Sequence, residues 1–168
     1  MTRMLRSAQH GREGRGLQAE IQQRKPFAGR EAEVFLNLVR TAEVLSQDVE
    51  RVLKPYGLTG TQYNVLRILR GAGPDGLACG EVSGRMVKHD PDITRLLDRL
   101  EARGLVTRAR EQRDRRVITT RITPAGLDLL TKLDGPVADW HRRALGHLGV
   151  RRLRALVGLL EAARETFG

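Results

Sequence analysis

The sequence predicts a mainly α-helical protein that carries one small β-hairpin, which makes it α+β by strict count. Apolar residues recur at three- and four-residue steps over most of the chain, a spacing that is typical of amphipathic helices. Residues 105–110 and 117–122 are rich in β-branched side chains and flank a charged hexapeptide. This second pattern favours an antiparallel hairpin with a long basic tip.

Composition narrows the class of protein and its partners. The 168 residues carry a formal net charge of +10, which makes a polyanion the expected partner. A single cysteine, Cys79, leaves no intramolecular disulfide. No apolar run approaches the ~20 residues of a membrane span, and no secretory signal is recognisable at the N-terminus. We therefore expect a cytoplasmic protein without membrane contact.

The N-terminal third divides into an extension and a long helix. Residues 1–29 form a basic extension, flexible over 1–16 and helical from Leu17 to Arg24. A long helix should follow from Arg30 to Lys54, before Pro55 and Gly57. Its apolar stripe comprises Val34, Phe35, Leu38, Ala42, Leu45, Val49, Val52 and Leu53.

Two shorter helices are expected next. Thr59 and Gln62 have the spacing of a capping box, and the helix that they open turns Tyr63, Leu66 and Leu69 inward before a Gly/Pro-rich loop at 71–76. A helix over about 79–87 should pack through Leu77, Val82 and Met86, although Ala78 stands where a Ser or Thr cap is usual.

The remaining helices have clear start signals. Asp90 and Pro91 suit the cap and first position of a helix that runs to Arg103, before Gly104. Thr123 and Pro124 open another in the same way, reaching about residue 145 with a bend at 135–136. A last helix should cover about 150–166.

This order of elements predicts a winged helix-turn-helix lobe on a helical dimerisation base. The expected divisions are the extension at 1–29, a first dimerisation helix at 30–58, the winged lobe at 59–123 and C-terminal dimerisation helices at 124–168. The terminal helices carry more apolar surface than the lobe can cover, so a monomer would expose a large patch. A two-fold dimer would place two equivalent helices about 34–36 Å apart, which suits a pseudopalindromic DNA site.

The helix that begins at Pro91 is the candidate DNA-recognition element. Its apolar stripe of Ile93, Leu96, Leu97 and Leu100 should face the core. The opposite face presents the candidate DNA-contacting residues, which with the residue at the helix start are Asp92, Thr94, Arg95, Asp98 and Arg99. Arginine can donate two hydrogen bonds to guanine, and threonine can contact a thymine methyl group. Taken alone, such a face is as typical of an ordinary solvated helix.

The hairpin tip makes the pattern more specific. Arg113, Arg115 and Arg116 lie within four residues of one another, together with Asp114. A basic loop on two strands can place a guanidinium in the minor groove, where the negative potential is enhanced. A solvated turn is the alternative for the tip alone, but the helix and the tip together favour duplex DNA.

These motifs resemble the MarR family of winged helix-turn-helix transcription regulators. The similarity rests on Leu58-Thr-x-x-Gln62, the segment from Thr94 to Val106, Asp114-Arg-Arg116 and Ile122-Thr-Pro-Ala-Gly126. The resemblance implies a homodimer with Arg116 aimed at the minor groove, Asp114 orienting it and Arg115 as the near alternative. It also implies a small anionic or phenolic effector. Pro91 and Asp92 depart from the family's commoner small polar residues.

The sequence gives less support to other kinds of site. Cys79 is expected to be a buried structural residue rather than a redox sensor, and the histidines lack the spacing of a metal site. Tyr63, Trp140 and His141 are candidates for an effector pocket, with helix packing as the alternative for Trp140 and His141. No arrangement of nucleophile and base, or phosphate loop, predicts an enzyme, and no cofactor is expected. Two functions remain: a repressor released by an effector, and a DNA-binding protein without an effector site, architectural or controlled by its concentration.

Overall fold

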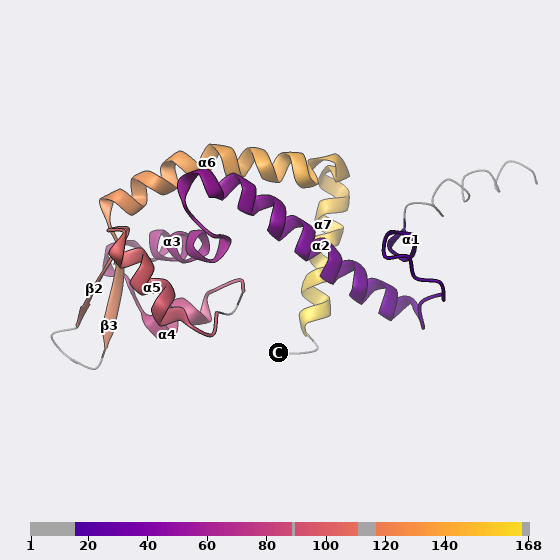
Figure 1. The fold of residues 1–168 in the computed structure, drawn as a ribbon, viewed down its shortest axis with the longest axis horizontal. Helices are drawn as coiled ribbons and strands as arrows, with labels where there is room; N and C mark the ends of the chain where they lie inside the picture. Colours follow the sequence, from indigo (N-terminus) through magenta and orange to yellow (C-terminus); the bar gives the residue numbers. More distant parts are fainter. Residues whose placement is uncertain (1–15, 89, 111–116, 166–168) are drawn as a thin grey trace, which may run out of the picture. The chain divides into compact units, whose positions relative to one another are not determined.

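A computed structural model describes residues 16–88, 90–110 and 117–165 (Figure 1). The chain falls into two compact units, residues 1–47 and 48–168. The first unit contains helix α1 (Leu17–Glu20) and most of helix α2 (Arg30–Leu53). Helix α2 begins as predicted, whereas α1 ends four residues before Arg24 because Gln22 adopts a left-handed backbone conformation with φ of 53°. An ion pair of 2.6 Å joins Arg40 of α2 to Glu20.

The second unit contains the winged lobe and the C-terminal helices. Its helices are α3 (Gly60–Ala72), α4 (Cys79–Gly84), α5 (Ile93–Ala102), α6 (Pro124–Leu145) and α7 (Gly149–Glu165). Its strands are β1 (Leu77–Ala78), β2 (Val106–Arg110) and β3 (Ile118–Ile122), and short 3-10 turns cover Lys54–Tyr56, Gly73–Asp75 and Gly146–Leu148. The mainly helical fold with a hairpin is therefore confirmed.

The sheet has one more strand than the sequence predicts. Its order is β1-β3-β2 and all pairs are antiparallel, with Leu77 opposite Thr120 and Val106 opposite Ile122. Two residues are too few for an alternating pattern, so β1 leaves no sequence signal. Strand β1 can pair with β3 because Gly76, with φ of 73°, comes closer to Thr120 than a residue with a Cβ could.

The helix caps explain which boundaries were predicted well. Thr59 and Gln62 form the expected reciprocal capping box, and the Thr123 hydroxyl accepts from the Gly126 N–H. At α4, the Glu81 carboxylate accepts from the Ala78 N–H, which partly replaces the missing cap. Helix α4 nevertheless ends at Gly84 rather than at 87, where glycine lowers the stability of the last turn.

One core holds the second unit together. Leucines of α3, α5 and α6 are almost fully buried there, and Val82 of α4 and Leu77 of β1 join them. Helix α6 continues through Gly135 and Pro136, so the predicted bend does not interrupt it. No described helix is long and apolar enough to cross a membrane.

Thr120 is a polar residue that is fully buried in this apolar core. Its side chain is fully buried on β3, and its hydroxyl has no hydrogen-bond partner among the described residues. We expect Thr120→Val to raise the free energy of unfolding by about 1 kcal/mol, because valine keeps the shape and removes an unpaired polar group. Urea denaturation of both proteins measures this change. A loss of stability would mean that the hydroxyl has a partner in solution.

Candidate nucleic-acid interface

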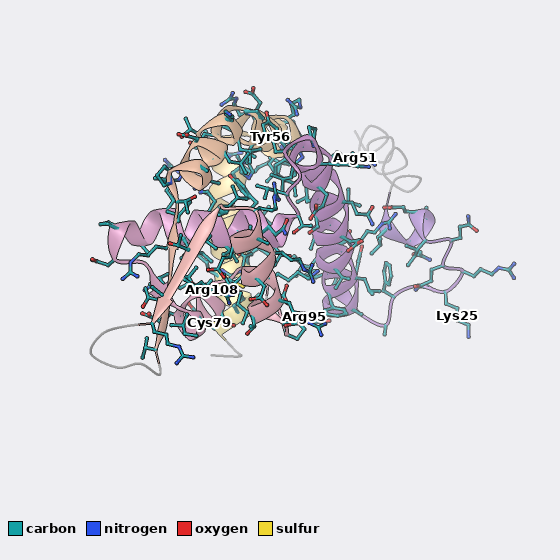
Figure 2. The ribbon with its side chains drawn as sticks, turned by 60° about the vertical axis from the view of Figure 1, so that its left-hand side comes forward. Lys25, Arg51, Tyr56, Cys79, Arg95 and Arg108 are labelled. Carbon is teal, nitrogen blue, oxygen red and sulfur yellow. The ribbon has the colours of Figure 1, made fainter. Side chains whose placement is uncertain are left out.

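Helix α5 presents a polar outer face on a leucine base. Leu96, Leu97 and Leu100 are buried and Ile93 is half-buried, as the periodicity predicts. The opposite face exposes Thr94, Arg95, Asp98 and Arg99. The side chain of Arg95 is 76% exposed and lies in the first turn of the helix (Figure 2). This face can therefore donate guanidinium and hydroxyl hydrogen bonds to a partner outside the molecule.

The start of α5 differs from the prediction. The helix begins at Ile93, and Asp92 rather than Asp90 is its cap, with a carboxylate that accepts from the Arg95 N–H at 3.3 Å. Asp90 instead accepts from the Asp92 N–H, which forms a turn over Pro91. Asp92 also pairs with the Arg95 guanidinium at 3.2 Å. The structure thus gives Asp92 a capping role.

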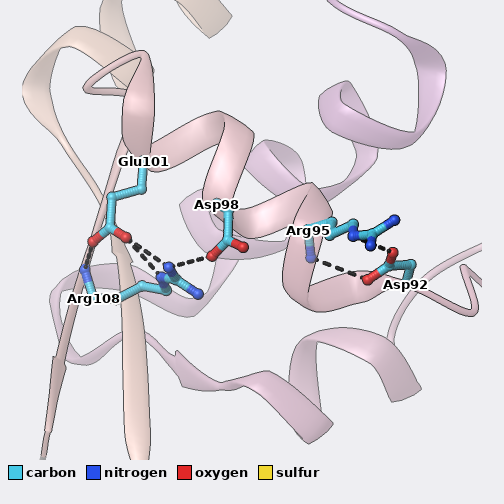
Figure 3. Close-up of polar contacts among 5 residues, drawn as sticks. All are labelled: Asp92, Arg95, Asp98, Glu101 and Arg108. Atoms are coloured by element: carbon cyan, nitrogen blue, oxygen red, sulfur yellow. Dashed lines mark hydrogen bonds and ion pairs between the residues drawn. The ribbon is translucent and has the colours of Figure 1, made fainter.

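Arg108 of β2 joins the strand to α5 (Figure 3). Its guanidinium contacts the Asp98 carboxylate at 2.5 Å and the Glu101 carboxylate at 2.8 Å. The other oxygen of Glu101 accepts from the Arg108 backbone N–H at 3.0 Å. Hydrogen bonding to Glu101, and then to Asp98, raises the pKa of Arg108 above its ordinary value. We call this three-residue contact the brace.

The brace fixes the hairpin relative to α5. Because Arg108 has only 22% of its side chain exposed, its charge is partly desolvated and its hydrogen bonds are stronger than those of an open surface pair. Arg108 and Glu101 are not among the residues predicted from the sequence, and Asp98 was predicted as a DNA contact. The available signal was the three-residue spacing of Asp98 and Glu101, which puts both carboxylates on one side of the helix.

We expect Arg108→Ala to lower the free energy of unfolding by about 1–2 kcal/mol, because both carboxylates lose a charged partner. Affinity for duplex DNA should also fall, because the hairpin is no longer held against α5. Arg110→Ala, two residues along the same strand and exposed, is the control and should change stability by less than about 0.5 kcal/mol. Equal stability of the two variants would show that the brace contributes nothing.

A second arginine holds the other end of α5. The Arg103 guanidinium donates to the Gly57 carbonyl at 2.5 Å and to the Tyr56 carbonyl at 3.2 Å. These carbonyls belong to the turn between α2 and α3. Arg103 therefore ties the C-terminal end of α5 to the start of the lobe.

Ion pairs also anchor α6. Arg70 of α3 donates two hydrogen bonds of 2.9 Å to the Asp134 carboxylate. Hydrogen bonding to Arg70 lowers the pKa of Asp134, so the pair stays charged at neutral pH. The Trp140 indole N–H donates to the Asp48 carboxylate at 2.9 Å, which fixes the last turns of α6.

The residues predicted for an effector pocket do not line either cavity described in the structure. Tyr63 is half-buried and its hydroxyl accepts from Arg67 at 3.0 Å. Trp140 is buried, and the exposed His141 lies beside it with ring centroids 4.9 Å apart. One cavity of about 300 Å³ lies elsewhere in the second unit, lined by Glu50, Arg51, Lys54 and residues 57–59. Another of about 800 Å³ lies within residues 16–33.

The predicted wing residues Arg113, Asp114, Arg115 and Arg116 lie outside the described residues. The strands that carry them pair in register from Arg110 opposite Ile118 to Val106 opposite Ile122. The role of the wing tip therefore stays a prediction. Cys79 is half-buried at the start of α4.

Comparison with known proteins places these features in a family. The pattern of the MarR family matches residues 56–117. The crystal structure of a MarR transcription factor from Planctomyces limnophilus is 41% identical, with a TM-score of 0.64, over 82% of this chain and 99% of that one. The crystal structure of a mutant MarR from E. coli complexed with operator DNA is 21% identical, with a TM-score of 0.74, over 83% of this chain and 99% of that one.

A curated Bacillus subtilis relative, the HTH-type transcriptional regulator YsmB, is 30% identical over 95 residues. The match covers 56% of this chain and 64% of YsmB, so this chain spans less than two thirds of that relative's length. The helix-turn-helix description agrees with the arrangement of α3, α4 and α5 beside the sheet.

Proposed function

From the premise that this chain belongs to the MarR family of DNA-binding transcriptional regulators, we propose that it is a repressor which binds a pseudopalindromic operator as a homodimer and is released by a small effector. The E. coli relative was crystallised with operator DNA, which supports operator binding here. One observation carries the proposal. The outer face of α5 exposes Thr94, Arg95 and Arg99, and the brace holds the helix against the hairpin.

In this proposal, Thr94, Arg95 and Arg99 contact base edges in the major groove. The two acidic residues of the predicted site, Asp92 and Asp98, do not contact DNA bases in this proposal. Asp92 caps α5 and Asp98 belongs to the brace, so both hold the helix in place instead of contacting bases. Carboxylates at these positions also repel phosphate, which limits how the helix can enter the groove.

The wing is assigned to the adjoining minor groove, with Arg116 as the inserted side chain, Arg115 as the alternative and Arg113 and Asp114 beside them. We expect Arg116→Ala to weaken binding of a selected fragment by about 1–3 kcal/mol, because a guanidinium in a narrow groove is lost. Gel-shift titration at fixed salt measures this. If Arg116→Ala and Arg115→Ala both bind the fragment with undiminished affinity, the wing assignment is refuted.

Unburied apolar residues support the homodimer. Phe35 of α2 is 62% exposed, and Val157 and Leu159 of α7 are 53% and 70% exposed. Helices with such faces are stabilised when a second copy covers them. Sedimentation analysis at micromolar concentration should give a dimer, and a monomer would contradict this part of the proposal.

The cavity beside Arg51 and Lys54 supports an effector. Arg51 and Lys54 outnumber the one carboxylate of its lining, Glu50, which already accepts from the Gly60 N–H. Lys54 can bind a small carboxylate or phenolate, while Arg51 also pairs with Asp48. The cavity borders the turn whose carbonyls hold Arg103. A ligand there would act on the position of α5 through that turn. The alternative, a DNA-binding protein without an effector, gains support from the filled surroundings of Trp140.

Selection of bound fragments from genomic DNA, including the DNA upstream of the gene, tests the function directly. We expect two related half-sites about one helical turn apart, and release by some members of a panel of aromatic carboxylates and phenols. Repression of a reporter placed behind the selected fragment would support the finer proposal. Binding without any sequence preference would contradict it.

A further inference from the structure

A cluster of cations lies where α6 meets α7, far from the recognition helix. Residues 142–154 contain five arginines and no acidic residue, and they cover the end of α6, the 3-10 turn and the first turns of α7 (Figure 1). We call this surface the basic corner. It comprises Arg142, Arg143, His147, Arg151, Arg152 and Arg154, all of which are exposed.

The positive charges of the basic corner have almost no carboxylate partners within the described residues. Among the described residues, only Arg142 of this set has a carboxylate within ion-pair distance, that of Asp139 one turn earlier. Arg151 and Arg152 also stand near the positive end of α7, whose first turn contains no acidic residue. Cations in that position weaken a helix. Arg142 and Arg143, in the last turn of α6, can stabilise that helix end. Arg151, Arg152 and Arg154 have no such role among the described residues, which leaves an external anion as the partner for most of the cluster.

We propose that the basic corner binds the phosphates of a second DNA duplex, so that the protein bridges two DNA segments. Guanidinium groups match phosphate oxygens in charge and geometry. Apart from His147, residues 142–154 include no aromatic side chain, whereas protein partners usually need aromatic anchors. A nucleic acid thus fits this surface better than an acidic protein does.

Its position separates this surface from the recognition face. Both belong to the second unit, and α6 leads from the sheet at its first residue to the corner at its last. A helix of 22 residues spans about 33 Å. The corner is therefore placed for a different duplex segment from the one that α5 contacts. This inference depends on DNA binding by the family and not on the proposed repressor or effector roles.

The test is a capture experiment with two duplexes. A fragment bound through the recognition face is fixed to beads, and a labelled duplex of unrelated sequence is added at fixed salt. The variant replaces Arg143, Arg151, Arg152 and Arg154 with glutamine. The control makes the same charge change at four scattered exposed positions, Arg24, Arg30, Lys132 and Arg164.

We expect the corner variant to bind the fixed fragment within about twofold of the parent, which also shows that it is folded. Capture of the labelled duplex should fall at least tenfold, and the slope of log affinity against log salt should become shallower by about 3.6, which is four lost phosphate contacts at roughly 0.9 each. The control variant should capture like the parent. Unchanged capture by the corner variant, an equal loss in the control, or competition by polyglutamate but not by free duplex would overturn the proposal.

Discussion

Gly126→Ala should lower the free energy of unfolding by about 3 kcal/mol, a large loss for the addition of a single methyl group. A Cβ at this position would lie 2.4 Å from the Leu105 carbonyl oxygen and 2.7 Å from Cγ1 of Ile122. The first of these contacts is with backbone, which cannot move aside without displacing the strand.

The joint at Gly126 explains why so small a change matters. The same Leu105 carbonyl accepts from the Thr123 N–H at 3.1 Å, and the Thr123 hydroxyl donates to the Gly104 carbonyl at 2.7 Å. These contacts fix the start of α6 on the turn between α5 and β2. A displaced first turn would therefore disturb α5 and α6 together.

Thermal unfolding at constant protein concentration measures this prediction, because the melting temperature of the proposed dimer would depend on concentration. The expected loss corresponds to roughly 10 °C for a chain of this size. Gly71→Ala is the matched control: Gly71 lies in α3 with open space around its Cβ, so the change should be neutral or slightly stabilising. If Gly126→Ala and Gly71→Ala had the same melting temperature, the close approach at Gly126 would not exist in solution.

The double variant Arg95→Ala/Arg99→Ala should weaken binding of a selected fragment at least 100-fold. Each arginine that hydrogen-bonds a guanine contributes about 1–3 kcal/mol of discrimination, and about 2.8 kcal/mol corresponds to a factor of 100. Both side chains are exposed on the outer face of α5, so their loss leaves the leucine core intact. Binding of unrelated DNA should fall much less.

Competition gel shifts with selected and unrelated duplexes measure both affinities. Lys25→Ala/Lys132→Ala removes the same charge from exposed positions outside α5 and should keep the specificity ratio. The account of the interface fails if the arginine variant loses specific and unrelated binding by the same factor, because its contacts would then be to phosphate alone.

The buried face of α5 was predictable because helical periodicity fixes which residues share a side. Leu96, Leu97 and Leu100 lie in the core for that reason. The first residue of α5 was not predictable, because Asp90 and Asp92, on either side of Pro91, are both possible caps. A turn closed by Asp90 prevailed over the preference for proline at the first helical position.

Contacts between distant residues were beyond the sequence pattern. The brace depends on how β2 passes α5, and the Trp140 contact joins residues 92 positions apart. Periodicity gives the face of each helix but not the position of one element along another. The contacts of Asp98 with Arg108 and of Trp140 with Asp48 were therefore not predictable, although helix packing was already the alternative to a pocket for Trp140. The strand β1 was missed because pairing with β3, and not local composition, creates it.

In the proposed complex, the outer face of α5 occupies the major groove of the operator. Methylation protection of guanine N7 on a selected fragment tests it most directly, because that atom lies in the major groove and accepts hydrogen bonds from arginine. The account predicts two protected patches about one turn apart, both lost in Arg95→Ala/Arg99→Ala at concentrations that restore binding. The same protection by the parent and the variant would contradict it.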